Sequence, residues 1–294
     1  MNTKSVFIII LAWNHKDDTR EALRSFLQDT YSNKKIVVVD NASSDGTSDL
    51  IRGEFETIEI LRSEENLGVS GGYNLGIDFA VSQNADYILI ANNDIVTDKN
   101  MISGLVETLE KYPHAGIAMP KIYHYYEDRS RLWCTGAHWR KFPPTVKMTN
   151  FNRKDWEMGS EPIPIEFAPS CVLLLRKQMI ETVGKFDTSY FFYFDDWDFS
   201  QRSRQAGYKI LFVPGAWMWH KVSISTQKSD KPALWWNRMG KSAALYYSRY
   251  HSPLEAFTFF LWYIIREVLK GKPNRAIAFL NGVIEFRKTY NKNN

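Results

Sequence analysis

Hydrophobic runs and amphipathic segments alternate along the first 120 residues. In segment 17–30, the spacing of Leu23, Phe26 and Leu27 predicts a helix with one apolar face. Apolar runs typical of strands lie at residues 5–13, 34–43, 57–63 and 86–96. Strands that alternate with helices predict a mainly parallel sheet whose two faces are covered by helices.

Polar side chains occur where these apolar runs stop. Asn14, Asp40, Asn66 and Asp94 each lie at or just past the end of a predicted strand. Ligands of such sheets bind beyond the carboxyl ends of the strands, so these four residues are expected to share a binding region. Asp94 follows two asparagines after a buried run, where its lost hydration must be compensated.

The pattern changes after residue 120. Segment 121–165 is predicted to be irregular, because it is rich in aromatic residues and prolines; a connection of this length is usually functional or mobile. Segment 165–187 returns to a strand and a helix, and segment 190–221 adds a helix with an acidic start and one more strand. From residue 233 onward the chain is predicted to form helices, and we divide the chain into three segments: 1–120, 121–232 and 233–294.

Composition narrows the classes of partner. The chain has 294 residues, a net charge of +4 and a pI near 8.8, which favours anionic ligands or a membrane surface and does not require nucleic acid. Cys134 and Cys171 have no metal-binding spacing and are expected to be packed thiols in a reducing cytosol. The N-terminal apolar run lacks a basic region and a cleavage site, so we expect a strand there rather than a signal peptide.

The C-terminal segment contains one apolar run, residues 257–265. It is far shorter than the ~20 residues that a transmembrane helix needs. Arg266, Lys270 and Lys272 follow it, which is compatible with an interfacial helix at a membrane. A helical pair packed on the rest of the protein is the second interpretation, and the sequence leaves both open.

Three motifs could contribute to a ligand site. The glycine-rich segment 66–76 opens a helix but matches neither dinucleotide-binding nor phosphate-loop spacing, which argues against a dehydrogenase. Segment 40–47, DNASSDGT, predicts either a nucleotide contact or a helix-capping turn. In segment 91–95, ANNDI, one carboxylate with neighbouring amides suits a divalent cation shared with diphosphate oxygens, or else a capped turn.

A second acidic group lies near residue 196. Asp195, Asp196 and Asp198 occur within four positions, and their mutual repulsion raises the proton affinity of at least one of them, which is compatible with a general base. The alternative is a solvated helix N-terminus, where acids are favoured by the helix dipole. His220 follows two nearby tryptophans at the end of a strand; a lone histidine there is more often structural than a ligand.

In this order, the motifs resemble the inverting family-two glycosyltransferases of the GT-A fold, particularly the rhamnosyltransferase-like branch, over residues 5–225. The resemblance implies an α/β fold with a mainly parallel sheet flanked by helices and a C-terminal helical extension. Residues 1–120 would be the nucleotide-sugar-binding half, residues 121–232 the acceptor-binding and catalytic half, and residues 233–294 a helical segment.

The resemblance also implies roles for individual residues. Asp196 would be the base, with Asp195 beside it, and Asp94 and His220 would hold Mg²⁺ or Mn²⁺. Donor-binding positions would be Asn14, Asp40, Asn66, Gly68, Gly71, Gly72, Asn74, Asn93 and Arg202. The acceptor-binding candidates are Trp133, Trp139, Trp197 and Asp198. Asp94, Asp196 and His220 are expected to share one cleft.

Two residues depart from the family pattern. Asn92 replaces the first acid of the D-x-D motif, which leaves less negative charge for a metal ion, and Asp195 replaces the usual glutamate. The Q-x-x-R-W motif and the transmembrane helices of processive relatives are absent from the sequence, which predicts transfer of a single sugar.

The expected reaction is inverting transfer from dTDP-rhamnose or a UDP-hexose to a hydroxyl of a glycan or lipid-linked acceptor, in cell-surface polysaccharide synthesis. A sugar nucleotidyltransferase is an alternative, but segment 10–18 lacks its glycine-rich signature with Arg and Lys. A catalytically silent carbohydrate-binding relative is another. We expect a cytoplasmic protein, with peripheral association at the inner face of the membrane left open.

Overall fold

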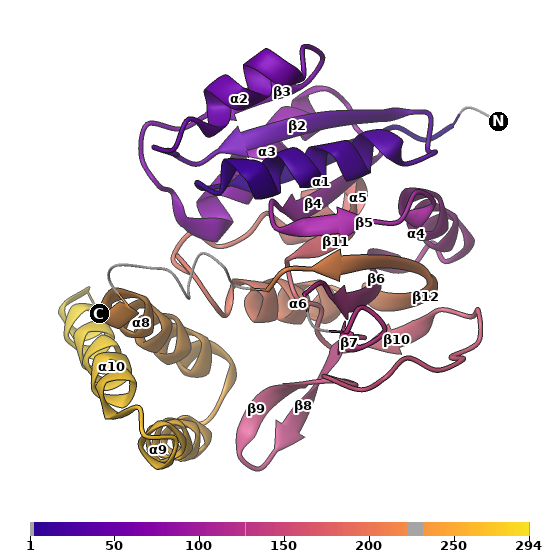
Figure 1. Cartoon of the computed structure of the whole chain (residues 1–294). Coiled ribbons are helices and arrows are strands. Elements are labelled where there is room, and N and C mark those ends of the chain that lie inside the picture. The colour runs from indigo at the N-terminus through magenta and orange to yellow at the C-terminus, as the bar shows by residue number, and fades with distance from the viewer. Residues whose placement is uncertain (1–2, 127, 223–231, 294) are drawn as a thin grey trace.

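The computed structural model describes residues 3–126, 128–222 and 232–293, which form a sheet flanked by helices and a separate group of C-terminal helices (Figure 1). The strands of the main sheet are β1 (Val6–Ala12), β2 (Lys34–Asp40), β3 (Glu59–Arg62), β4 (Tyr87–Asn92), β5 (Ile95–Thr97), β6 (Ala115–His124), β7 (Leu132–Cys134), β10 (Ile163–Ile165), β11 (Val172–Arg176) and β12 (Lys209–His220). Their order is β10-β12-β6-β11-β4-β1-β2-β3, with β5 paired to β12 and β7 paired to β6.

The first half of this sheet is parallel. Strands β3, β2, β1 and β4 pair in parallel, as the alternating pattern predicts, and β6 and β12 form another parallel pair. Strand β11 runs antiparallel between β4 and β6 and joins the two groups. Every residue of β1 is buried, because it lies in the middle of a sheet that is covered on both faces.

Helices from the first two thirds of the chain cover the sheet. They are α1 (Lys16–Gln28), α2 (Thr47–Glu54), α3 (Gly68–Ser82), α4 (Met101–Lys111), α5 (Lys177–Val183) and α6 (Asp195–Gln205). Helices α1 and α4 lie on one face and α3 lies on the other (Figure 1). A Cβ at Gly76 would lie 2.2 Å from Cγ2 of Ile9, so only glycine allows α3 to lie this close to β1.

Two predictions about regular structure were wrong. The apolar run 86–96 is not one strand, because β4 ends at Asn92 and β5 pairs antiparallel with β12. Asp94 lies in the short connection between β4 and β5. Segment 121–165 is not irregular throughout. Besides β7 and β10 it contains the antiparallel hairpin of β8 (Ala137–Lys141) and β9 (Pro144–Met148), whose residues lack a clear alternation of polar and apolar side chains.

The C-terminal helices form a second hydrophobic core. They are α8 (Pro232–Tyr250), α9 (Pro253–Leu269) and α10 (Pro273–Asn293), and this core also contains Tyr190 and Phe194, which precede α6. Helices α8 and α10 approach closely at Gly240 and Gly282, where an added Cβ would lie about 2 Å from backbone oxygen of the other helix. The helices are therefore packed on the sheet domain, and no helix among the residues described is both long and apolar enough to cross a bilayer.

Candidate active site

Asp94 and His220 meet at the end of the sheet because β5 pairs with β12. In this antiparallel pair His220 lies opposite Ile95, the residue after Asp94. The Nε2 atom of His220 is 3.2 Å from Oδ1 of Asp94, and the two side chains are 6% and 13% exposed. The sheet thus joins two residues that are 126 positions apart in the sequence.

This pair suits a divalent cation. Oδ1 of Asp94 and both ring nitrogens of His220 are buried and have no partner of hydrogen-bond geometry among the residues described. Burial alone would raise the pKa of Asp94, but the adjacent His220 lowers it below its usual value, so the carboxylate is anionic. No group of three or more His, Cys, Asp or Glu side chains in the described ranges forms a metal site. Mg²⁺ is commonly bound by one or two protein carboxylates together with substrate phosphates, and Asp94 supplies one such carboxylate.

A cavity of about 150 Å³ lies over this pair. Asn66, Gly68 and Asn93, all predicted donor-binding residues, line it together with Asp94 and His220. Gly68 has a φ of +74°, and a Cβ there would lie 2.5 Å from the carbonyl oxygen of Phe191, so glycine is required on both grounds. The sequence interpretation missed other lining residues, which include Trp13, Asn41, Phe191, Phe192 and Trp235.

Asparagine side chains fix the loops around this first cavity. Nδ2 of Asn41 donates to Oδ1 of Asn66 at 3.1 Å and to the carbonyl oxygen of Gly68 at 3.0 Å. Nδ2 of Asn93 donates to the carbonyl oxygen of Asn14 at 3.0 Å. Asn14 itself lies outside the cavity lining and supports the loop after β1. The amides thus order the strand ends rather than all facing a ligand.

Asp40 is buried beneath the loop that follows β2. Its carboxylate accepts hydrogen bonds from the backbone of Ser43, the hydroxyl of Ser48 and the guanidinium of Arg62, the last at 3.0 Å. The Asp40 side chain is fully buried, whereas Arg62 is 48% exposed. The carboxylate of Asp40 is thus occupied by contacts within the protein, and the role of Asp40 in donor binding stays a prediction.

Four other predicted donor-binding residues do not line the first cavity. Gly71 and Gly72 allow α3 to pack tightly, since an added Cβ would lie 2.7 Å from Leu67 and 2.4 Å from Leu11. Asn74 bonds both the backbone nitrogen and the backbone oxygen of Phe186. Arg202 pairs with Asp198 at 2.7 Å and donates to the carbonyl oxygens of Val183 and Lys185. The two glycines thus have packing contacts and the two polar residues have hydrogen bonds within the protein, and the donor-binding roles of all four stay predictions.

The acidic pair at residues 195–196 begins α6 after a constrained turn. Tyr193 and Phe194 have φ values of 61° and 64°, a left-handed conformation that bulky residues adopt only when surrounding contacts hold them. The hydroxyl of Ser70 on α3 donates to the carbonyl oxygen of Tyr190, and that of Ser242 on α8 donates to Phe192. Helices from both ends of the chain therefore position the two acids.

Both acids hold protons more tightly than an ordinary aspartate. Burial raises the pKa of Asp195 to about 6, although the hydroxyl of Ser170 donates to it at 3.2 Å. Burial, and then the charge of Asp195, raises the pKa of Asp196 well above its usual value. Because the two groups interact, the apparent pKa values belong to the pair. A carboxylate that accepts a proton near neutral pH suits a general base.

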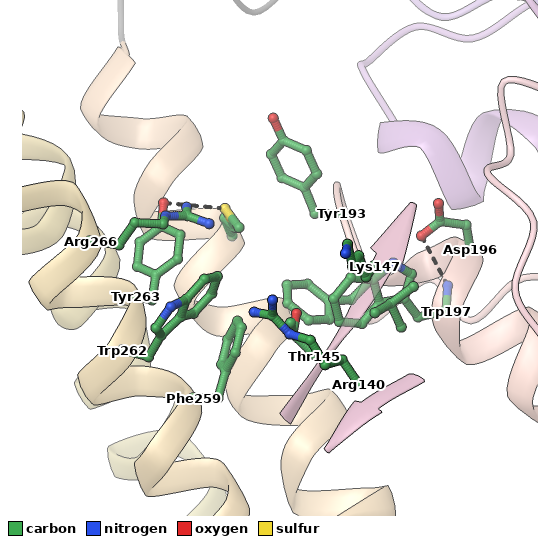
Figure 2. A pocket seen from close by; sticks show the side chains of 13 residues that line it. Arg140, Thr145, Lys147, Tyr193, Asp196, Trp197, Phe259, Trp262, Tyr263 and Arg266 are labelled. Atoms are coloured by element: carbon green, nitrogen blue, oxygen red, sulfur yellow. Dashed lines mark hydrogen bonds between the residues drawn. The ribbon is translucent and has the colours of Figure 1, made fainter. Parts of the chain in front are cut away.

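Asp196 lines a second cavity, of about 320 Å³. Phe191 and Phe192 line the first cavity, whereas Tyr193 and Phe194 line the second with Asp196, so one aromatic segment contributes to both cavities. Figure 2 shows the second cavity, with Tyr193 and Asp196 among the residues that line it. The buried thiol of Cys171 has a raised pKa, chiefly through burial, then through the neighbouring Cys134, and to a lesser extent through the charges of Asp94 and Asp196. The charges of both acids act on this one thiol, so Asp94 and Asp196 lie near each other although they line different cavities, and their sharing of one cleft stays a prediction.

Among the predicted acceptor-binding residues, Trp197 alone lines the second cavity. Trp133 packs edge-on against His220 with ring centroids 4.7 Å apart, and Trp139 stacks on His251 at 4.2 Å. Asp198 is fully buried and accepts a hydrogen bond from Tyr250 of α8 at 2.8 Å. Trp133 and Trp139 remain partly exposed, so their roles in acceptor binding stay predictions, whereas the side chain of Asp198 is not accessible to a ligand in this structure.

The raised pKa values predict an unusual pH dependence. A base works only when deprotonated, and the pKa of Asp196 is raised well above its usual value, so activity is expected to fall at a pH well above the usual aspartate range near 4. Asp195→Asn keeps an oxygen for Ser170 but removes the charge that raises the pKa of Asp196, so its acidic limb should move to lower pH. Profiles of kcat/KM for both proteins test this, and a wild-type limb near pH 4 would refute it.

The fold and the site together define a transferase of the GT-A type. The sheet is flanked by helices, Asp94 and His220 lie at its strand ends, and the acid pair Asp195 and Asp196 lies near them. A family model described as Glycosyl transferase family 2 matches residues 7–184. This is more than half of the chain, and the chain therefore belongs to glycosyl transferase family 2. The resemblance seen in the sequence is confirmed.

Curated relatives include two mycobacterial enzymes. The chain is 26% identical over 212 residues to the N-acetylglucosaminyl-diphospho-decaprenol L-rhamnosyltransferase of Mycobacterium tuberculosis. This match covers 65% of this chain and 67% of the relative. It is also 26% identical over 214 residues to galactofuranosyltransferase GlfT1 of the same organism, covering 70% and 66%. The matches thus span about two thirds of each relative.

Solved structures share the fold. GalNAc-T7 with UDP, GalNAc and Mn²⁺ superposes with a TM-score of 0.61 at 15% identity, over 74% of this chain and 44% of that chain. The mannosyltransferase PcManGT from Pyrobaculum calidifontis, in complex with GDP-Man and Mn²⁺, has a TM-score of 0.58 at 13% identity, over 97% and 88%. These similarities confirm the predicted fold class.

Proposed function

We propose that the protein transfers one sugar from a nucleotide-diphosphate sugar, dTDP-rhamnose or a UDP-hexose, to a hydroxyl of a glycan or lipid-linked acceptor. The reaction would depend on Mg²⁺ or Mn²⁺, invert the anomeric configuration and serve cell-surface polysaccharide synthesis. The observation that supports this best is the placement of the Asp94–His220 pair in one cavity and of Asp196 in the neighbouring one. The mycobacterial rhamnosyltransferase and the Mn²⁺ complexes agree with it.

The first cavity would hold the donor. Asp94 and His220 would bind the cation, which when present would neutralise charge on the departing diphosphate. Gly68 opens α3 at this cavity, and its backbone can approach a ligand closely because it has no side chain. The aromatic rings of Trp13 and Trp235, whose centroids are 5.9 Å apart, would exclude water.

Asp196 would remove the acceptor proton. An alcohol is a weak nucleophile at neutral pH, and a positioned base typically contributes ~10²–10⁴ to the rate. The hydroxyl oxygen would attack the anomeric carbon from the side of Asp196 while the bond to the diphosphate breaks on the opposite side, which inverts the configuration. Asp195, buried at 4% exposure, would keep the proton affinity of Asp196 high.

Thermal-shift screening against nucleotide sugars, with and without Mn²⁺, tests the proposal. A specific donor should raise the melting temperature only with the metal, and should be hydrolysed slowly to the nucleoside diphosphate. A catalytically silent relative would bind without hydrolysis, and a sugar nucleotidyltransferase would instead consume a nucleoside triphosphate. Binding of no nucleotide sugar would refute the proposal.

We also propose that the protein works from the cytoplasm, at the inner face of the membrane. One face of α9 exposes apolar side chains at helical spacing: Leu254, Phe257, Leu261, Ile265 and Val268, which are 45–73% exposed. Lys270 and Lys272, also exposed, follow this helix and would contact anionic lipid headgroups. An amphipathic helix with basic residues at its end fits a bilayer surface.

Two substitutions on this face should abolish vesicle binding. Leu261→Gln with Ile265→Gln removes apolar area from residues that are 45% and 48% exposed, so stability should change little. Sedimentation with vesicles containing anionic lipid is the measurement, and Ile163→Gln is the control because Ile163 is 44% exposed on β10. Equal sedimentation of all three proteins would contradict membrane docking through α9.

A further inference from the structure

The second cavity joins the sheet domain to the C-terminal helices. Its walls come from the β8–β9 hairpin, the start of α6 and helices α8 and α9. In Figure 2, Asp196 and Trp197 lie on one side and Trp262, Tyr263 and Arg266 on the other. At about 320 Å³ the cavity is within the range of ligand sites, and it is larger than the donor cavity.

This second cavity is rich in positive charge. Arg140 and Lys147 of the hairpin and Arg266 of α9 line it, whereas Asp196 is the one acid among its described lining residues. Arg266 is neutralised by Glu267 at 2.8 Å, outside the lining. Arg140 and Lys147 have no ion pair within 4 Å in the ranges that the structure describes.

Arg140 has the clearest unmet requirement. Its Nε is buried and has no hydrogen-bond partner among the described residues, and its guanidinium lies 5.9 Å from the ring of Trp262. Leaving a charged donor desolvated and unpaired is unfavourable, and an anion in the cavity would remove this penalty. In the hairpin Arg140 is opposite Thr145, two residues from Lys147, so all three side chains are on the same face.

An apolar wall adjoins these cations. Phe259, Trp262 and Tyr263 of α9 line the same cavity. Leu261 and Ile265, on the next side of the helix, belong to its exposed apolar face. A ligand that combines an anionic group with a hydrocarbon chain would satisfy both surfaces. Arginine and lysine together suit phosphate, which accepts several charge-assisted hydrogen bonds at once.

We infer that the second cavity binds an acceptor whose sugar is attached to phosphate, with the phosphate held by Arg140 and Lys147 and a sugar hydroxyl directed to Asp196. This rests on the proposed function and adds the chemical class of the acceptor. The phosphate can belong to a lipid-linked sugar or to a soluble phosphorylated glycan, and the two sources differ in the hydrocarbon chain that would lie against α9.

Calorimetry with geranyl diphosphate in EDTA tests the inference without donor or metal. Wild-type protein should bind it at least ~10-fold more tightly than geraniol, since each charge-assisted hydrogen bond contributes about that factor. Arg140→Gln with Lys147→Gln should reduce its affinity to that of geraniol. Lys141→Gln, an exposed cation on the same hairpin outside the cavity lining, should have no effect.

Pyrophosphate separates the two sources. Weaker binding of pyrophosphate than of geranyl diphosphate would assign the site to a lipid-linked sugar, and equal binding would assign it to a soluble phosphorylated glycan. If geraniol binds as tightly as geranyl diphosphate, or if the double variant loses no affinity for geranyl diphosphate, the inference is wrong. Lys147→Gln alone keeps the test valid if the double variant does not fold. Donor binding with Mn²⁺ is measured separately, so a failure of the proposed function can be distinguished from a failure of this inference about the acceptor.

Discussion

Asp196→Asn is expected to lower the rate of sugar transfer by ~10²–10⁴, the usual contribution of a positioned general base. The amide keeps the size of the side chain but cannot accept the proton of the acceptor hydroxyl. Donor affinity should stay within a few-fold of wild type, because Asp196 lines the second cavity and the donor is expected in the first. The measurement is kcat with saturating donor, with donor affinity determined by calorimetry.

Two controls accompany this measurement: the stability of Asp196→Asn and the transfer rate of a matched variant. Asp196 is partly buried with a raised pKa, so removing its charge should not destabilise the fold at neutral pH. Asp49→Asn, on α2 and 87% exposed, should leave transfer unchanged. Transfer by Asp196→Asn within a few-fold of wild type would exclude Asp196 as the base.

Asp94→Asn is expected to weaken metal-dependent donor binding by at least ~100-fold. Changes to residues around a metal ligand typically reduce metal affinity 10–100-fold, and Asp94 is the one carboxylate in the proposed pair. Asparagine keeps the size of the side chain and an oxygen that can lie beside Nε2 of His220, 3.2 Å away in the wild-type structure, so the substitution should leave the fold intact. The measurement is donor titration with Mn²⁺ and again with EDTA.

Asp98→Asn is the matched control for this variant. Asp98 lies four residues further on, and its carboxylate accepts from the backbone nitrogen of Asn100 at 2.9 Å. The donor affinity of Asp98→Asn in the presence of Mn²⁺ should equal that of the wild-type protein. If Asp94→Asn binds donor with the same dependence on Mn²⁺ as wild type, the metal site lies elsewhere.

Much of the fold could be predicted because it follows from local patterns. The alternation of apolar runs and amphipathic segments indicates the parallel strands β1, β2, β3 and β4, and their common direction places Asn66 and Asp94 at one edge. Pairing of distant strands has no such local signal. The separate strand β5 and its pairing with β12 depend on tertiary contacts, so the 3.2 Å approach of Asp94 to His220 could be expected only from the family resemblance.

The site was predicted less completely than the fold. Asn74 and Arg202 match positions of the family motif, but the structure uses them to bond backbone groups. Conversely Arg140 and Trp235 lie in segments without a motif and reach the two cavities only because the hairpin and α8 pack against α6 and the sheet. The doubled phenylalanines at 191–192 were a usable signal, since aromatic residues directly before paired acids indicate a partly buried site.

The central claim is that the donor cavity at Asp94 and His220 and the base at Asp196 serve one reaction. Crystals soaked with Mn²⁺ and a non-hydrolysable nucleotide sugar would test it most directly. We predict an anomalous peak for Mn²⁺ between Asp94 and His220, in contact with the diphosphate, and an anomeric carbon whose open side faces Asp196. Manganese bound away from Asp94, or a sugar that points away from Asp196, would contradict the account.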